Sequence, residues 1–459
     1  MPCLRVSLVF AVLCSVAVTQ GGCGHHDGGQ ATDAGGTPVD ACEGLGCSIV
    51  NCGAQNLPPT QVSGTVYAPN GTLPLYGVTV YVPITDPGPL TAGVTCDRCG
   101  TSLPGGAYTS ATTDETGHFT LSDVPAAQNV PLVIQVGKWR RQLVLPQVAA
   151  CQESALSAVQ TTLPARHTDG DMPQIAITTG NADALDCLVR KLGIADSEIT
   201  TDAQSGRVHL YNGNGAKQFA AGFAGGSGTF SNATTLWGSV DKLAGYDIVL
   251  FSCEGGQNPG TKPQSAMDAV HDYAGRGGRV FLSHWHNIWI GGDQNDATHV
   301  LSDWKETSTF DFTAGQPPMG SSQPTLVDES SSKGTAFANW LLDTGASAVR
   351  DQLPVVDARY TCKSATQGKA EQWVYVDPAQ PLLTGVTGVQ DMLFTTPLDM
   401  PDGSRCGKVV FSDMHVSSDS SSKPGTAYPG GCSTTPLTPQ EKALAFIFFD
   451  ISSCVGALF

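Results

Sequence analysis

Basic residues and long apolar runs are scarce in this sequence. Lys and Arg number 24 against 41 Asp and Glu in 459 residues, so the formal net charge is -17 at pH 7, and no basic stripe interrupts the acidic background. Because the phosphate backbone of nucleic acid is itself anionic, we expect no nucleic-acid partner. With 41% hydrophobic residues the chain is too polar for a bundle of membrane helices, and we expect a soluble protein of more than one domain.

Several catalytic signatures are also absent. The sequence contains no HExxH zinc motif, no GxSxG nucleophile elbow, no GxxxxGK[ST] phosphate loop and no EF-hand spacing. Each of these motifs sets reactive groups at a fixed geometry, so none of these enzyme or calcium-binding classes is indicated by motif.

The first 22 residues have the pattern of a signal peptide. Arg5 precedes an apolar run over residues 6–18, which is too short to span a bilayer. Gly22-Cys23 then resembles the end of a bacterial lipobox, which implies a lipid on Cys23 and a membrane contact through it. Gln20 stands where lipoproteins carry a Leu-like residue, so secretion with a free amino terminus is the alternative. We expect an exported protein, at the outer membrane, at the cell surface or secreted.

The chain has 15 cysteines. Cys3 and Cys14 leave with the signal peptide, and a lipid on Cys23 leaves 12, an even number as disulfide pairing requires. Cys96 and Cys99 form a CxxC motif, but neither a second CxxC nor a thioredoxin-like βαβ pattern accompanies them. We therefore predict disulfides and not a redox or zinc site.

Residues 23–60 have the composition of a flexible, cysteine-containing tether. Residues 61–165 then comprise short β-strands and a linker, with strands predicted in QVSGTVYA, GVTVYVP, HFTLSDV and VPLVIQVGKW. Together with the turn TDETGHF, this part resembles the carboxypeptidase-regulatory-like domain, a small prealbumin-like β-sandwich. The resemblance implies an accessory module.

From residue 172 to 459 strands and helices alternate. PQIAITTG, YDIVLFSCEGG and GGRVFLSHWH are apolar strands with helical segments between them. QLPVVDARY, EQWVYV, DMLFTTP and GKVVFSDMHV are late strands. A capping box from Thr438 to Glu441 begins a final helix. The pattern predicts a multi-domain protein whose second domain is α/β, with a mostly parallel, doubly wound sheet.

Three of the predicted strands end in polar residues, where ligands meet parallel sheets: Ser252-Cys253-Glu254, Ser283-His284-Trp285-His286 and Ser412-Asp413-Met414-His415. This layout resembles the flavodoxin-like fold of class I glutamine amidotransferases, especially their trehalose-utilisation-type relatives. In that family a cysteine nucleophile stands at the position of Ser283 or His284. Because this cysteine, its flanking glycines and a Glu after His415 are missing, glutaminase activity is not implied, and Cys253 is expected in a disulfide. The whole arrangement resembles secreted myxobacterial lipoprotein-like proteins, whose activity is not established.

Two kinds of catalytic site fit these strand ends. His284 and His286 lie two apart, so on an extended strand they project to one face and, with His415, Asp413 or Glu254, could bind a divalent metal. Alternatively, Ser283 is a nucleophile, His415 its base and Asp413 the residue that orients the base. Either site would make the protein a hydrolase.

A binding site is the third alternative, and the one that the sequence favours. Glu254, Trp285 and Trp289, with Trp304 and Trp340, could line a polar and aromatic groove for a saccharide or a peptide. The competing interpretation is that these tryptophans pack the surrounding loops. We predict a non-catalytic surface binding lipoprotein, with the metal-dependent or serine-type hydrolase as the alternative.

Overall fold

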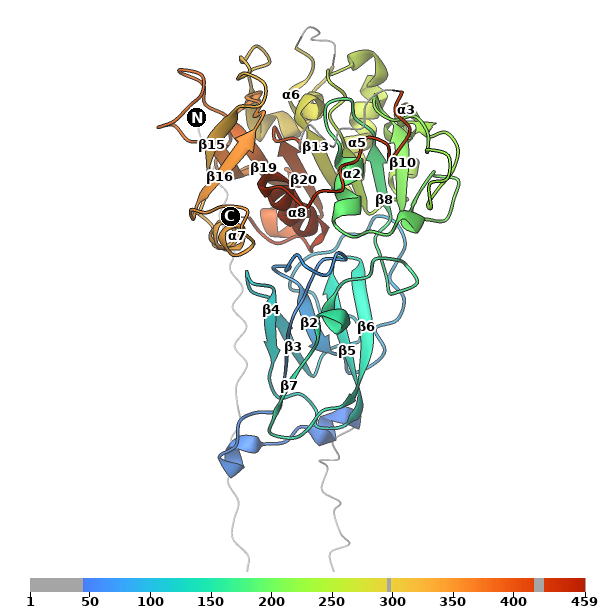
Figure 1. Ribbon diagram of the computed structural model, residues 1–459, viewed down its shortest axis with the longest axis vertical. Helices are drawn as coiled ribbons and strands as arrows, with labels where there is room; N and C mark the ends of the chain where they lie inside the picture. The colour runs from blue at the N-terminus through green and yellow to red at the C-terminus, as the bar shows by residue number, and fades with distance from the viewer. Residues whose placement is uncertain (1–43, 295–298, 417–424, 459) are drawn as a thin grey trace, which may run out of the picture. The chain divides into compact units, whose positions relative to one another are not determined.

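The computed structural model describes residues 44–294, 299–416 and 425–458 (Figure 1). The predicted signal peptide and Cys23 lie outside these residues, so the expected leader and lipid anchor stay predictions. None of the helices in the described ranges has the length and apolar character needed to cross a membrane.

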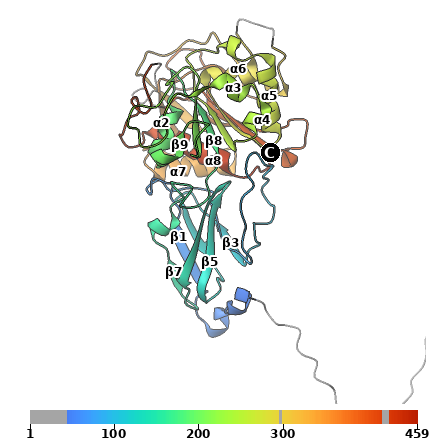
Figure 2. The ribbon, with the colours of Figure 1, turned by 90° about the vertical axis from the view of Figure 1, so that its right-hand side faces the viewer.

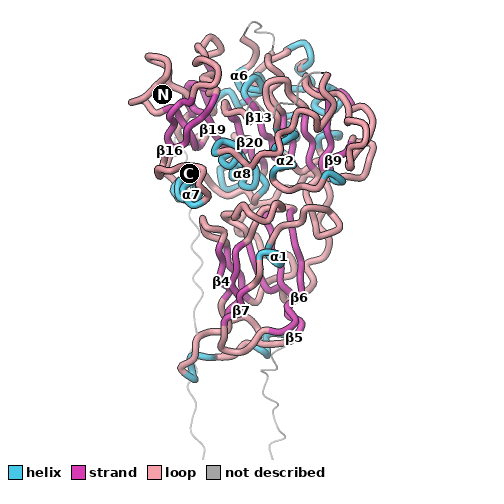
Figure 3. The backbone as a smooth tube through the Cα atoms, viewed as in Figure 1, coloured by secondary structure: helices cyan, strands magenta, loops and turns pink. Residues whose placement is uncertain are grey.

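Residues 61–155 form seven strands in two small sheets, which are magenta in Figure 3. One sheet has the order β4-β1-β7 and the other the order β3-β2-β5-β6. Apolar side chains from both sheets share one core, for example Val62 and Leu121 with Val80 and Ile134. The strands are β1 (Gln61–Thr65), β2 (Thr79–Val82), β3 (Thr109–Thr112), β4 (His118–Leu121), β5 (Gln128–Val136), β6 (Trp139–Gln147) and β7 (Glu153–Ala155), followed by helix α1 (Ala158–Thr161).

The turn TDETGHF adopts the geometry that its residues favour. The Asp114 carboxylate accepts hydrogen bonds from the backbone N–H groups of Thr116 and His118, both at 2.9 Å. Gly117 has a φ of 74°, and a Cβ there would lie 2.9 Å from the carbonyl oxygen of Val66. A glycine is therefore required where this turn meets β1.

A second, larger sheet contains eleven strands among the described residues, in the order β11-β10-β8-β12-β13-β20-β19-β18-β15-β16, with β9 paired to β10. Its strands are β8 (Ile175–Thr178), β9 (Ile199–Thr200), β10 (Val208–Asn212), β11 (Ser231–Asn232), β12 (Ile248–Phe251), β13 (Arg279–Ser283), β15 (Ser322–Val327), β16 (Gln352–Val356), β18 (Glu371–Val376), β19 (Val389–Thr396) and β20 (Gly407–Ser412). Two further strands, β14 (Ser308–Phe310) and β17 (Cys362–Ala365), pair with each other.

The larger sheet is mixed. The strands from β11 to β20 are parallel, and those from β20 through β19, β18 and β15 to β16 are antiparallel. Strands β18, β19 and β20 follow one another without an intervening α-helix, and parallel neighbours need a long crossover. The described part of the sheet is therefore mostly parallel, as expected, and its antiparallel part comprises β19, β18, β15 and β16.

Both faces of the central strands are buried. Ile177 and Leu250 belong to a core with helices α2, α7 and α8, whereas Val249 and Phe251 belong to a second core with helices α3 and α5. Figures 1 and 2 show these two groups of helices on opposite sides of the sheet. The helices are α2 (Leu185–Lys191), α3 (Ala233–Trp237), α4 (Val240–Leu243), α5 (Gln264–Gly275), α6 (Ile288–Gly291), α7 (Ser332–Asp343) and α8 (Pro439–Ser452).

Between residues of the described ranges, four disulfides join distant segments: Cys52–Cys151, Cys96–Cys406, Cys99–Cys454 and Cys187–Cys432. Cys96 and Cys99 pair with different partners, so the predicted disulfide fate of the CxxC motif is confirmed. Cys253 and Cys362 are free and buried, and the expected disulfide of Cys253 is wrong. Since disulfides persist in oxidising compartments, the protein is extracytoplasmic.

Trp139, at the start of β6, packs against the last helix of the chain. Its indole is fully buried and lies 5.7 Å and 5.4 Å from the rings of Phe448 and Phe449, measured between centroids. Its Nε1 donates to the carbonyl oxygen of Pro164 at 3.1 Å. Trp139 thus ties the small sheets to α8 by packing, and its hydrogen bond fixes the indole against the segment that follows α1.

We expect Trp139→Ala to lower the free energy of unfolding by about 3–5 kcal/mol, because it leaves a cavity and removes the indole hydrogen bond. Urea unfolding followed by circular dichroism measures the change. Val144→Ala, on the same strand with 59% of its surface exposed, is the control and should shift stability by no more than about 0.5 kcal/mol. Equal effects of the two substitutions would contradict this account of α8 docking.

Candidate functional site

Three neighbouring parallel strands, β12, β13 and β20, end in polar residues at the same edge of the sheet. Cys253 follows β12, His284 follows β13, and His415 lies three residues after β20. Each offers one atom that can bind a metal, and these atoms lie within 4.8 Å of one another. We call the three residues the Cys-His-His cluster. The structure brings together the strand ends that the sequence singled out, with the thiol of Cys253 as an additional member.

His284 occupies a strained bend. It is the first residue after β13, where the chain enters a short 3-10 turn, His284–Asn287, and its φ is 40°. Such a left-handed conformation is uncommon for a residue with a side chain and concentrates at functional sites. Of the two residues considered for the elbow position, Ser283 and His284, the bend therefore falls on His284.

The cluster is buried and uncharged. Exposed fractions are 0% for Cys253, 2% for His284 and 6% for His415. Burial first, and then the positive charge of Arg359, lowers the pKa of His415 to about 3. Burial, followed by His415 and Arg359, places the pKa of His284 well below its ordinary value. Both imidazoles are therefore neutral at pH 7.

The Cys253 thiol is also neutral without a metal. Burial raises its pKa to about 12, although hydrogen bonds from the backbone of Trp285 and Gly255 oppose that rise. Its Sγ lies 3.5 Å from Nδ1 of His284. A protonated thiol is a poor nucleophile, so the metal-free arrangement does not support covalent catalysis by Cys253.

His286 does not join the cluster. Its Nε2 lies 3.0 Å from the carbonyl oxygen of Ser252, and its Nδ1 accepts a hydrogen bond from Nε1 of Trp289 at 2.9 Å. The prediction that His284 and His286 face the same way is wrong, because both lie in the 3-10 turn, where the alternation of an extended strand does not apply.

The predicted serine triad does not form. The Ser283 hydroxyl donates to Asp183 at 2.5 Å. The Asp413 carboxylate accepts from the Thr361 hydroxyl at 2.7 Å and from the backbone N–H of Cys362 at 2.8 Å. Within the described ranges, neither Ser283 nor Asp413 has a hydrogen bond to His415. Thus Ser283 lacks its base and His415 lacks its orienting carboxylate.

The aromatic groove proposed from the sequence is absent from the described residues. Trp289, Trp304 and Trp340 are only 3%, 1% and 0% exposed and pack in the two cores. Glu254 is also buried, and its carboxylate is paired with the ammonium group of Lys262 at 2.5 Å. Of these predicted ligand-binding residues, Trp285 alone is partly exposed. Tryptophan packing, the competing interpretation, is the correct one.

A cavity of about 660 Å³ opens beside the cluster. Its lining residues lie in segments 316–322, 354–359 and 415–416 and at the start of α8, and they include His415 and Arg359. We call it the strand-end cavity. Another cavity of about 760 Å³ is lined by Arg190 and Lys191, but these cations are already paired with Asp196 and Glu441. The strand-end cavity is therefore the better candidate site.

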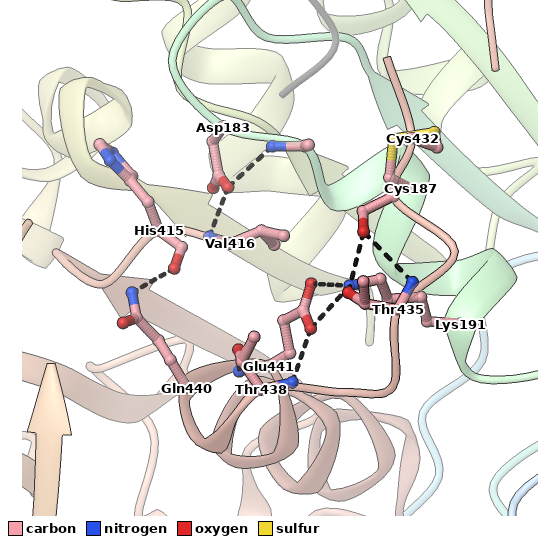
Figure 4. A network of polar contacts seen from close by, with 12 residues as sticks. Asp183, Cys187, Lys191, His415, Val416, Cys432, Thr435, Thr438, Gln440 and Glu441 are labelled. Carbon is pink, nitrogen blue, oxygen red and sulfur yellow. Dashed lines mark hydrogen bonds and ion pairs between the residues drawn. A yellow bond between two sulfur atoms is a disulfide. The ribbon is translucent and has the colours of Figure 1, made fainter. Parts of the chain in front are cut away.

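Hydrogen bonds hold the segment that carries His415 (Figure 4). The Gln440 side chain, on α8, donates to the His415 carbonyl oxygen. Asp183, after β8, accepts from the backbone N–H of Val416 at 2.8 Å and from Ser283 at 2.5 Å. One buried carboxylate thus links the ends of two site strands.

Sequence reasoning missed Asp183 and Arg359. Asp183 follows β8, a fourth strand of the parallel half with a polar end, so a search of every strand end would have included it. Arg359 lies in an irregular segment after β16, and no sequence pattern marks it. Its position at the cavity depends on how the late strands fold back on the sheet.

Comparisons with known proteins identify no family. No family model and no curated protein matches this sequence. Among solved structures, a cytoplasmic protein from Salmonella typhimurium is 12% identical, with a TM-score of 0.30, over 60% of this chain and 98% of that chain. A mutant type II cohesin–X-dockerin complex from Acetivibrio cellulolyticus is 18% identical, with a TM-score of 0.15, over 32% of this chain and 78% of that chain. Scores this low carry neither fold nor function over to this chain.

We expect Asp183→Asn to change how stability depends on pH. Burial raises the pKa of Asp183 from 3.8 to about 6. A raised pKa means that the folded state holds the proton more tightly, so the parent loses about 3 kcal/mol as pH rises through this range. Asparagine keeps an oxygen for Val416 and can donate to Ser283, but it does not titrate. The stability of the variant relative to the parent should therefore rise by about that amount between about pH 4 and pH 8.

Urea titrations across this pH range measure the difference. Asp241→Asn is the control, because Asp241 is exposed at the start of α4, and its substitution should leave the pH profile of the parent unchanged. If Asp183→Asn and the parent have parallel profiles, Asp183 does not titrate as its burial requires.

Proposed function

We propose that this chain is an exported binding protein whose strand-end cavity holds a small ligand with an anionic group, a carboxylate or a phosphate. The observation that carries the proposal is Arg359 in the cavity lining. Arg359 is partly exposed, and among the described residues no acidic side chain forms an ion pair with it. Charge-assisted hydrogen bonds from arginine suit both groups.

Electrostatics support an anionic ligand. The charge of Arg359 lowers the pKa of both His415 and His284, so a positive potential reaches the cavity floor. Nη1 of Arg359 donates to the carbonyl oxygens of Asp357 and Ala358 at 2.6 Å and 3.2 Å, which holds the guanidinium in place. A peptide carboxylate or an acidic saccharide would supply the anion, so both expected ligand classes fit this proposal.

The cellular location of the protein and its family relationships are part of the same proposal. The disulfides support a place outside the cytoplasm, and the sequence features around Cys23 support a lipid anchor at the outer membrane or cell surface. The parallel half of the sheet, with a strained residue after β13 and a histidine after β20, supports kinship with the amidotransferase-like fold. The seven-stranded part with its TDETGHF turn supports a relationship to the prealbumin-like β-sandwich. The occurrence of these two parts in one chain supports membership of the secreted myxobacterial family.

A hydrolase is the second candidate, and the Cys-His-His cluster favours it. A metal held by these residues would supply an activated water at the cavity floor. An ester, amide and glycoside panel, assayed with added Zn²⁺, separates the candidates. Turnover that disappears in His415→Ala would favour the hydrolase, whereas saturable binding without turnover favours the binding protein.

We expect Arg359→Ala to weaken anion binding about 10- to 100-fold, the loss expected for hydrogen bonds to a charged group. Calorimetric titration with citrate, glutamate, glucuronate and inorganic phosphate measures the affinity of the parent and the variant. Arg276→Ala is the matched control, since Arg276 is exposed at the end of α5 and does not line the cavity. Absence of binding by all four anions, or equal binding by parent and variant, would contradict the proposal.

A further inference from the structure

We propose that Cys253, His284 and His415 form a zinc site with three protein ligands, whose fourth coordination position faces the strand-end cavity. The site rests on the proposed function and deepens it, because the anionic group of the ligand would occupy that fourth position beside Arg359.

The spacing of the cluster matches tetrahedral zinc. Zinc binds imidazole nitrogen at about 2.0 Å and thiolate sulfur at about 2.3 Å, so tetrahedral angles place these two ligand atoms about 3.5 Å apart. The distance from Cys253 Sγ to His284 Nδ1 is 3.5 Å. The ligand atoms of all three residues lie within 4.8 Å, so small side-chain rotations close the site.

Two buried nitrogens lack partners. Nε2 of His284 and Nε2 of His415 have no hydrogen-bond partner among the described residues, and the two rings lie 5.1 Å apart, measured between centroids. An unsatisfied buried polar atom costs about 1–3 kcal/mol. Because Nδ1 of His284 faces the thiol, zinc bound there would leave Nε2 of His284 as it is, and the atom that zinc would satisfy is Nε2 of His415. An unpartnered imidazole nitrogen beside a thiol and a second imidazole is the arrangement expected of a metal site.

The donor types select the ion. One sulfur and two imidazole nitrogens suit zinc, whereas calcium and magnesium require oxygen ligands. Catalytic and ligand-exchanging zinc sites keep three protein ligands and one open position, while structural sites are closed by four. Cys253 and His284 face the interior and His415 lines the cavity, so the open position faces the cavity.

Backbone groups and a carboxylate hold two of the three proposed ligands in place. The backbone of Trp285 and Gly255 donates hydrogen bonds to Cys253 Sγ, and such bonds stabilise negative charge on sulfur. Asp183 holds the His415 segment through Val416, so the position of this ligand is set by a carboxylate outside the cluster. These supports resemble the outer-sphere partners that orient metal ligands.

Zinc binding by the full chain tests the proposal directly. The untagged protein, kept free of reductant so that its disulfides stay intact, is stripped with a chelator and dialysed against zinc chloride. Atomic absorption then gives the metal content. We expect Cys253→Ala, His284→Ala and His415→Ala each to contain about one zinc fewer per chain than the parent, because loss of a direct ligand weakens binding beyond the roughly 10- to 100-fold cost of an outer-sphere change.

Two matched controls separate site loss from general damage. Cys362→Ala removes a second buried free thiol, and His118→Ala removes an exposed imidazole; both should retain the zinc content of the parent. Equal zinc content in the parent and all three cluster variants would overturn the site.

Cobalt substitution provides a readout that needs no variant. The parent loaded with Co²⁺ should show tetrahedral visible bands and a thiolate-to-cobalt charge-transfer band, and Cys362→Ala should retain both. A parent without the thiolate band overturns the proposal even if the cluster variants fail to fold. Arg359→Ala should bind zinc like the parent and bind glucuronate about 10- to 100-fold more weakly. A parent chain that binds glucuronate but retains no zinc would overturn the metal site alone and leave the proposed function standing.

Discussion

Parallel backbone pairing of β12, β13 and β20 sets the position of every cluster residue. Ser283 on β13 pairs with Ser412 on β20, and Phe251 on β12 pairs with Leu282 on β13. The residues that follow these pairs leave the sheet together at one edge. A change of one residue in either register would move a cluster side chain by about 3.3 Å along the strand direction, relative to the other two.

Burial sets the protonation state of the residues at this edge of the sheet. The same apolar strands that stabilise the sheet remove water from Cys253, His284 and His415, so the thiol and both imidazoles are neutral. Arg359 supplies a positive charge at the rim of the cavity, where the residue remains partly exposed. Neutral donors on the floor and a cation at the rim are complementary to a metal ion and an anion respectively.

The segments outside the central strands hold this edge in place. Helix α8 contributes Gln440 to the His415 carbonyl and contacts Trp139 of the small sheets through its phenylalanines. Disulfides from Cys96 and Cys99 reach Cys406 and Cys454. The small sheets therefore act as a support for the C-terminal segments as well as a module in their own right.

The sequence alone determined the elements whose signals are local. Apolar runs predicted the buried strands, turn residues predicted the bend at Asp114, and the capping box predicted the start of α8. Polar residues directly after those runs also marked the correct edge of the sheet. The carboxyl ends of parallel strands lie at the same edge, independently of the other elements of the fold.

The tertiary structure alone decided which of these polar residues meet. His286 turns away because a 3-10 turn replaces the extended strand. Ser283, Asp413 and Glu254 are each bound by residues at least eight positions away in the sequence, namely Asp183, Thr361 and Lys262. Cys253 stays free because its neighbour across the sheet is His284 and not another cysteine. These side-chain partners come from segments that are distant in the sequence. The spacing of residues along one strand therefore cannot predict them.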